Sequence, residues 1–130
     1  MVKLKRYCIK YIRDRAKSGY VKDDKCFICN EFDDLDFHHF YTLTLLLKRW
    51  RLKNKVEDED ILEWRDVFIA QHSPELYEHA VTLCHIHHMK LHSIYGKNPN
   101  LGTAKKQARW VNIQREKHEK NIINNRTTFI

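Results

Sequence analysis

Residues 79–92, His79-Ala-Val-Thr-Leu-Cys84-His-Ile-His87-His88-Met-Lys-Leu-His92, join a short apolar segment to a run rich in histidine. The β-branched segment 80–83 predicts a strand, and the residues after it predict a helix of about ten residues that ends near Gly96. A second run, Leu35-Asp-Phe-His38-His39-Phe40, predicts another short strand that is rich in aromatic residues. We therefore expect the functional side chains on these two strands and on the helix of 79–96.

The spacing of the histidines on the predicted helix favours metal binding. His88 and His92 are four residues apart, so they stand one above the other on a single helix face and can clamp one ion. His87 lies about 100° round the helix from His88 and cannot comfortably share that site. The neighbouring histidines are thus expected to divide between two metals.

A pair of cysteines, Cys26-Phe-Ile-Cys29, is the half-site of a tetrahedral zinc knuckle. Cys84 and His87 could supply the other two ligands, from the end of the second strand and the first turn of the helix. Thiolate and imidazole ligands in this geometry favour structural Zn²⁺.

Three points about the knuckle stay open at the level of sequence. The Cys-x-x-Cys pair could instead be a redox pair, although the βαβ context expected for one is absent. His85 or His88 could compete with His87 as the fourth ligand. Cys8 is expected to be a small apolar core residue rather than a ligand.

The adjacent histidines His38 and His39 point to opposite faces if the first run is a strand. Both can then serve one site only if one of them binds an ion and the other reaches the substrate from the side. The expected geometry therefore has one of these two rings at the ion and the other ring beside the substrate.

The remaining segments are expected to form helices around this centre. Residues 3–17 predict a basic helix with an apolar stripe that includes Tyr7 and Tyr11. Between the strands we expect a helix over 43–54, a helix that starts at a capping box of Asp60 and Glu63, and a short helix capped by Ser73 and Pro74. Thr103 is expected to cap a last helix over about 104–120, with a poorly ordered tail from Asn121.

Composition limits the class of protein. A length of 130 residues suggests one domain, and 24 Lys and Arg against 17 Asp and Glu give a formal charge of +7, which favours polyanionic partners. No apolar stretch is long enough for a membrane span, and the N-terminus lacks the apolar region of a secretory signal. We therefore expect a reducing cytoplasm and cysteines that bind metal or stay free.

These motifs resemble those of HNH endonucleases of the His-Me finger (ββα-metal) superfamily. The matching residues are Asp36-Phe37-His38-His39, His79 to Cys84, and His87-His88-x-x-x-His92. The double histidine is most similar to the nuclease colicins, and the knuckle to phage and restriction HNH proteins. The resemblance implies a mostly helical α+β fold with a two-strand hairpin and a zinc staple. Its segments are a basic helix (1–20), the knuckle and first strand (26–40), a helical insertion (41–78), the second strand and metal helix (79–96), and a basic helix (103–120).

The resemblance also implies a reaction, the metal-dependent hydrolysis of DNA phosphodiesters to 5′-phosphate and 3′-hydroxyl ends. His38, His88 and His92 would bind the catalytic ion, and His39 would be the general base. Nitrogen ligands suit Zn²⁺, Ni²⁺, Co²⁺ or Mn²⁺ better than Mg²⁺. His79 falls where the family has an asparagine that orients the base.

The expected partner is DNA, without an organic cofactor and without a membrane. Five cations near the predicted site are candidates for phosphate contacts, namely Lys90, Lys97, Lys105, Lys106 and Arg109. The resemblance points to a phage-encoded protein in the host cell. Two alternatives stay open, a zinc-stabilised DNA-binding or adaptor module with a decayed nuclease site and a colicin-like toxin domain.

Overall fold

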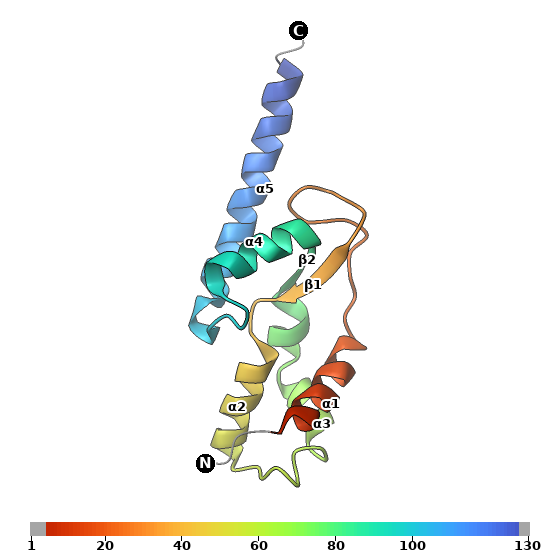
Figure 1. The fold of residues 1–130 in the computed structure, drawn as a ribbon, viewed down its shortest axis with the longest axis vertical. Helices are drawn as coiled ribbons and strands as arrows, with labels where there is room; N and C mark the ends of the chain where they lie inside the picture. Colours follow the sequence, from red (N-terminus) through yellow and green to blue (C-terminus); the bar gives the residue numbers. More distant parts are fainter. Residues whose placement is uncertain (1–4, 128–130) are drawn as a thin grey trace.

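The computed structural model describes residues 5–127 of the chain, and the side chains of residues 5–123. It is a mixed helix and strand structure, mainly helical, with one two-stranded sheet (Figure 1). In chain order the elements are α1 (Arg6–Lys17), β1 (Leu35–His39), α2 (Leu43–Asn54), α3 (Arg65–Gln71), the π-helix η1 (Pro74–Glu78), β2 (Ala80–Cys84), α4 (His85–Tyr95), the 3₁₀-helix η2 (Leu101–Thr103) and α5 (Ala104–Thr127).

Strands β1 and β2 pair antiparallel, and β2 leads directly into α4. The register places Leu35 opposite Cys84 and His39 opposite Ala80. The backbone N–H of His85 donates to the carbonyl of Asp34 at 2.8 Å, which ties the start of α4 to the start of β1. Two strands and a helix therefore lie together as the sequence indicates, although a long connection with α2, α3 and η1 separates the strands.

Two groups of buried side chains stabilise the fold. One group joins α1, α2, α3 and η1 around Leu46, Leu47 and Phe68, and the other joins the cysteine segment, the strands, α4 and α5 around Leu83 and Leu91. The end of β1 thus lies where the two groups meet (Figure 1). Among the described residues, no helix is both long and apolar enough to cross a membrane.

Helix α1 buries a narrower stripe than its sequence predicts. Cys8, Ile12 and Ala16, each four residues apart, are fully buried, whereas Tyr7 and Tyr11 are exposed. The expectation that the two tyrosines face the core is therefore wrong. Small side chains at two of the three buried positions let α1 approach its neighbours closely.

The predicted capping box at Asp60 and Glu63 is also wrong. Residues 58–64 form turns, and α3 begins only at Arg65. Arg51 of α2 pairs with Asp58 at 2.7 Å, and both side chains are mostly buried. This ion pair holds the acidic run against α2, where it cannot form the first turn of a helix.

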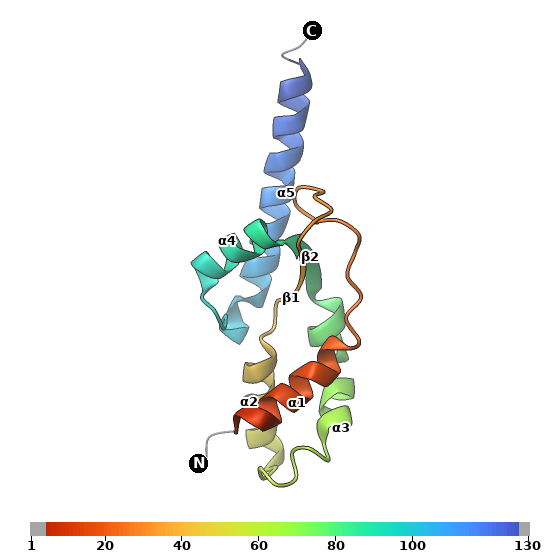
Figure 2. The same cartoon turned by 45° about the vertical axis from the view of Figure 1, so that its right-hand side comes forward.

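Helix α5 is longer than predicted. It continues to Thr127, so residues 121–127 are helical rather than poorly ordered, and the rest of the expected tail lies outside the described residues. Thr103 belongs to η2, and its hydroxyl donates to the carbonyl of Asn100. The first turns of α5 pack through Ala104 and Val111, and the rest projects beyond the body in both views (Figures 1 and 2).

Candidate functional site

Three histidines from β1 and α4 converge with one ring nitrogen each. Nδ1 of His38 lies 3.1 Å from Nε2 of His88, and Nε2 of His92 lies 2.9 Å from the same atom. His38 is almost fully buried, and His88 and His92 are half-buried. Antiparallel pairing and the immediate start of α4 after β2 bring together residues that are far apart in the chain.

Each of these rings has its outer nitrogen bonded to a group that can only accept. Nε2 of His38 donates to Oε1 of Gln107 at 2.8 Å, Nδ1 of His88 to Oδ2 of Asp36 at 3.0 Å, and Nδ1 of His92 to the carbonyl of Gly96 at 2.8 Å. The orientation of the Gln107 amide is fixed because its Nε2 donates to Phe40 and Thr103. A neutral imidazole carries one hydrogen, so every inner nitrogen presents a lone pair.

Lone pairs that face one another at 2.9–3.1 Å repel unless a cation lies between them. A proton is a poor candidate, because burial lowers the pKa of His38 to about 3 and lowers the pKa of His88. Zn–N bonds of about 2.0–2.1 Å in tetrahedral geometry place nitrogens about 3.3 Å apart, close to the observed spacing. The donor set therefore fits a transition-metal ion, and its outer acceptors are those that orient metal-binding histidines.

Gly96 contributes to this arrangement through its backbone. It ends α4 with φ of +89°, a conformation that residues with a Cβ rarely adopt. Its N–H donates to the carbonyl of His92, and its own carbonyl accepts from the ring of His92. The turn that ends α4 thus also fixes the orientation of one histidine.

The cysteines form a second group with the geometry of a metal site. Ligand atoms of Cys26, Cys29, Cys84 and His87 all lie within 4.8 Å of one another. The Sγ atoms of Cys29 and Cys84 are 3.8 Å apart, which is too long for a disulfide and close to the spacing of about 3.8 Å for two thiolates on one tetrahedral zinc. His87, and not its two histidine neighbours, points to these sulfurs.

Electrostatics at this group favour a bound cation. Burial alone would raise the pKa of the Cys26 thiol, but backbone N–H groups that include those of Cys84 and Ile28 outweigh burial and lower it. Burial and the neighbouring sulfur of Cys26 raise the pKa of Cys29. One thiolate is therefore stabilised by the backbone, while a second beside it needs a positive charge.

His39 lies next to this centre but contacts other elements. The backbone N–H of Leu43, which can only donate, points to its Nε2 at 3.4 Å, and Nδ1 lies 3.3 Å from the hydroxyl of Tyr20. The tautomer that satisfies both contacts carries its hydrogen on Nδ1 and its lone pair on Nε2. Burial, with the nearby ring of His88, lowers the pKa of His39 to about 4, so the ring is neutral at pH 7.

Tyr20 is itself held by aromatic contacts. Its ring stacks on Phe37 at 4.2 Å and meets Tyr77 edge-on at 5.8 Å. Burial raises the pKa of Tyr20 to about 12, so the phenol keeps its hydrogen. The position of this hydroxyl beside His39 is therefore set by packing.

His79 makes different contacts from those that the resemblance implies. Its exposed ring packs edge-on against Tyr41 at 5.7 Å, and its backbone carbonyl accepts from the N–H of Phe40 at 3.0 Å. These contacts hold the end of the strand pair. The partner of Nδ1 of His39 is instead Tyr20, whose hydroxyl oxygen accepts from Nδ1 in the tautomer given above.

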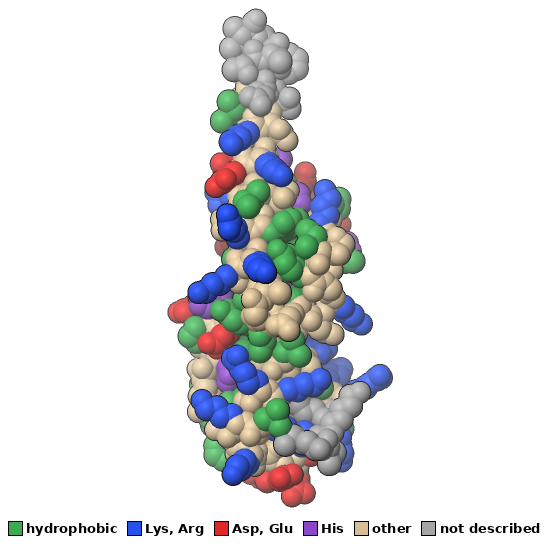
Figure 3. All heavy atoms as spheres, turned by 90° about the vertical axis from the view of Figure 1, so that its left-hand side faces the viewer, with side chains coloured by type: hydrophobic (Ala, Val, Ile, Leu, Met, Phe, Trp, Pro, Cys, Tyr) green, Lys and Arg blue, Asp and Glu red, His purple; other side chains and the backbone are tan. Residues whose placement is uncertain are grey.

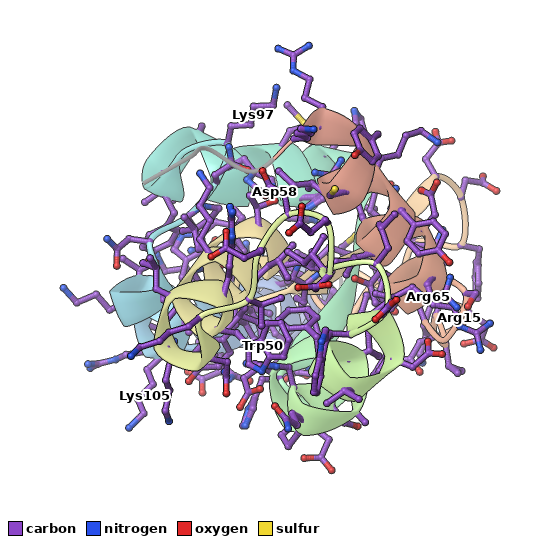
Figure 4. All side chains as sticks on the ribbon, turned by 90° about the horizontal axis from the view of Figure 1, so that it is seen from below. Arg15, Trp50, Asp58, Arg65, Lys97 and Lys105 are labelled. Atoms are coloured by element: carbon purple, nitrogen blue, oxygen red, sulfur yellow. The ribbon has the colours of Figure 1, made fainter. Side chains whose placement is uncertain are left out.

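A hollow of about 260 Å³ opens over these histidines. Its lining includes four histidines, three residues from α1 and the loop after it, and two residues after α4, namely His38, His39, His88, His92, Arg13, Lys17, Tyr20, Lys97 and Pro99. Of the five cations expected to contact DNA, only Lys97 is among its described lining residues. Lys90, Lys105, Lys106 and Arg109 are exposed elsewhere, and Lys97 and Lys105 point to opposite sides of the body (Figure 4).

A family model described as the nicking endonuclease family, and named for phage T5, matches residues 1–127. The chain belongs to this family. It is therefore an endonuclease of phage type that acts on DNA, which confirms that part of the sequence-based expectation. No solved structure matches the chain.

Some residues of the candidate site have little signal in the sequence. Asp36 is two residues before His38 on one strand, so both point to the same face, and this spacing could have indicated its role. Tyr20 and Gln107 come from segments far from the histidine motifs, and no local pattern marks them. Packing between distant elements brings them to the site.

Proposed function

We propose that this nicking endonuclease is a metal-dependent HNH enzyme with a ββα-metal centre. His38, His88 and His92 hold a catalytic divalent ion, and His39 is the general base. The observation that carries the proposal is the hydrogen-bond pattern of the three rings, each with an outer N–H bonded to an acceptor and an inner lone pair toward the others. Three convergent lone pairs repel one another unless a cation lies between them, so they do not by themselves stabilise the fold.

The protein's own groups supply orientation and proton transfer. Nε2 of His39 accepts a proton from the attacking water, and the long contact from Leu43 is readily replaced by that water. Tyr20 holds the Nδ1 hydrogen and so fixes which nitrogen is basic. The chemistry that the ion supplies when bound is stabilisation of the charge that develops on the phosphate and the leaving 3′ oxygen.

We further propose that Cys26, Cys29, Cys84 and His87 bind a structural Zn²⁺. The sulfur spacing and the backbone donors at Cys26 support this assignment. Such a site would link the loop before β1 to the junction of β2 and α4. It would thereby hold the strand that carries His38 and His39 against the helix that carries His88 and His92.

Replacing His39 by alanine tests the assignment of the base. Conversion of supercoiled to nicked plasmid with Mn²⁺, Ni²⁺ or Mg²⁺ is expected to slow by about 10²–10⁴-fold, the usual contribution of a general base. Binding of DNA and the melting temperature should stay unchanged. A His39→Ala protein that binds DNA and nicks at the rate of the parent would show that His39 is not the base.

Replacing Tyr20 by phenylalanine tests the orienting hydrogen bond. The variant keeps the stacking on Phe37 but loses the hydroxyl at Nδ1 of His39, so kcat for nicking should fall about tenfold with KM unchanged. Tyr77→Phe is the matched control, because the Tyr77 hydroxyl donates to the backbone carbonyl of Ala16 and not to His39. Equal kcat values for both variants would remove the orienting role of Tyr20.

A further inference from the structure

Four cations of α1 form one row on its exposed surface. Arg6, Lys10, Arg13 and Lys17 are spaced four, three and four residues apart, so they fall within about 60° of one another around the helix. All four are exposed, while the buried stripe of α1 lies on another face. A row with this spacing presents positive charge in one direction.

The row leads into the hollow over the histidines. A second hollow runs along α1 and is lined by Arg6, Lys10, Arg13 and Lys17, together with Ile9 and Asp14. Arg13 and Lys17 also line the hollow that contains the four histidines. The two depressions therefore share a wall, and the positive surface is continuous from Arg6 to the candidate catalytic centre.

The dimensions suit a nucleic acid backbone. The separation of eleven residue steps from Arg6 to Lys17 spans about 16 Å of helix, roughly the axial length of five nucleotides at about 3.4 Å each. The acidic member of the groove, Asp14, forms an exposed pair with Lys10 at 2.9 Å. Such surface pairs contribute little, so Lys10 can exchange this partner for a phosphate.

We propose that the α1 row binds consecutive phosphates of the DNA strand that is cut. This inference rests on the proposed function, because the row is placed relative to the candidate catalytic histidines. Arg13 and Lys17 hold the backbone next to the scissile phosphate, and Arg6 and Lys10 hold phosphates further along. Lys97 lines the same hollow.

Positive side chains also occur on other surfaces, so the proposal needs a charge-matched control. The face in Figure 3 carries Lys and Arg side chains from α5 down to the body, with fewer acidic ones among them. Arg15 lies on α1 but outside the row, where it approaches Asp66 at 3.7 Å and points to the same side as Arg65 (Figure 4). Lys53 is exposed in the last turn of α2 and lines neither hollow.

The test compares two double variants of the whole protein, Arg13→Gln with Lys17→Gln and Arg15→Gln with Lys53→Gln. Each loses two exposed positive charges, so their net charges are equal. Binding of a fluorescent duplex of about 20 base pairs is measured by anisotropy from about 50 to 200 mM salt without added divalent ions. For the variant of Arg13 and Lys17, the slope of log K against log salt should be shallower by about 1.8 than for the parent. Its affinity at the lower salt concentration should be weaker by about tenfold or more.

The control variant should keep the parent slope within about 0.5. Equal slopes for the two variants, or no change in either, would overturn the proposal and leave only general attraction between a basic protein and DNA. The measurement requires no cleavage. A parent protein that binds through the row but never nicks would instead contradict the proposed function, so the two failures are distinguishable.

Discussion

Replacing His88 by alanine is expected to abolish nicking and leave the fold intact. His88 lies between the other two histidines, with its Nε2 3.1 Å from His38 and 2.9 Å from His92. Its removal takes away the central ligand, and the remaining pair would bind an ion much more weakly. Metal ions contribute several kcal/mol to phosphodiester cleavage, so nicking should fall by about 10⁴-fold or more.

The matched control for this variant is His85→Ala. His85 is also on α4 and also contacts Asp36, at 3.1 Å, but it is exposed and outside the three-histidine group. Plasmid nicking, the circular dichroism spectrum and the melting temperature are compared for both variants with the parent. If His88→Ala nicks as fast as His85→Ala, the ion is not held by these histidines.

Replacing Cys29 by serine is expected to unfold the protein, whereas His88→Ala is expected to remove activity and keep the fold. Apparent free energies of structural zinc binding are about 10–16 kcal/mol, while small domains have a total stability of about 5–15 kcal/mol. A protein whose knuckle no longer binds zinc should therefore be largely unfolded at 37 °C. Activity would be lost as a consequence of unfolding rather than of a change at the catalytic site.

Cys8→Ser provides the comparison for the knuckle. Cys8 is fully buried, whereas Cys29 is partly buried, and Cys8 packs among apolar side chains of α1 and α2 and belongs to no metal-binding group among the described residues. Its substitution should cost about 1–3 kcal/mol and leave one zinc per chain. Elemental analysis and thermal melts compare the Cys29→Ser and Cys8→Ser variants. If the Cys29→Ser protein contains no zinc and still melts at the temperature of the parent, the structural zinc site is wrong.

Local patterns in the sequence are sufficient to predict the elements that carry the histidines. The β-branched run before Cys84 and the four-residue spacing of His88 and His92 depend only on neighbours in the chain, and both strands and α4 form where they predict. The division of His87 and His88 between two groups also follows from helix geometry alone. Whether metals occupy these groups stays a prediction.

Tertiary contacts decide what local patterns do not. The acidic run that resembles a helix start is instead held by the Arg51–Asp58 pair, a contact that no local rule contains. Gln107 bonds a histidine that is 69 residues away in the chain, and Tyr20 reaches His39 because aromatic packing places it there. The resemblance to HNH enzymes implies that His79 orients His39. In the structure, His79 packs against Tyr41, and the side chain that contacts Nδ1 of His39 is Tyr20.

The most direct test of the catalytic centre is a crystal structure of the parent protein with Mn²⁺, analysed by anomalous diffraction at the manganese edge. We predict a peak bonded to Nδ1 of His38, Nε2 of His88 and Nε2 of His92, at roughly 2.0–2.3 Å from each, with Nε2 of His39 free to accept a proton. No peak between these three rings, or a peak with His39 among its ligands, would contradict the account.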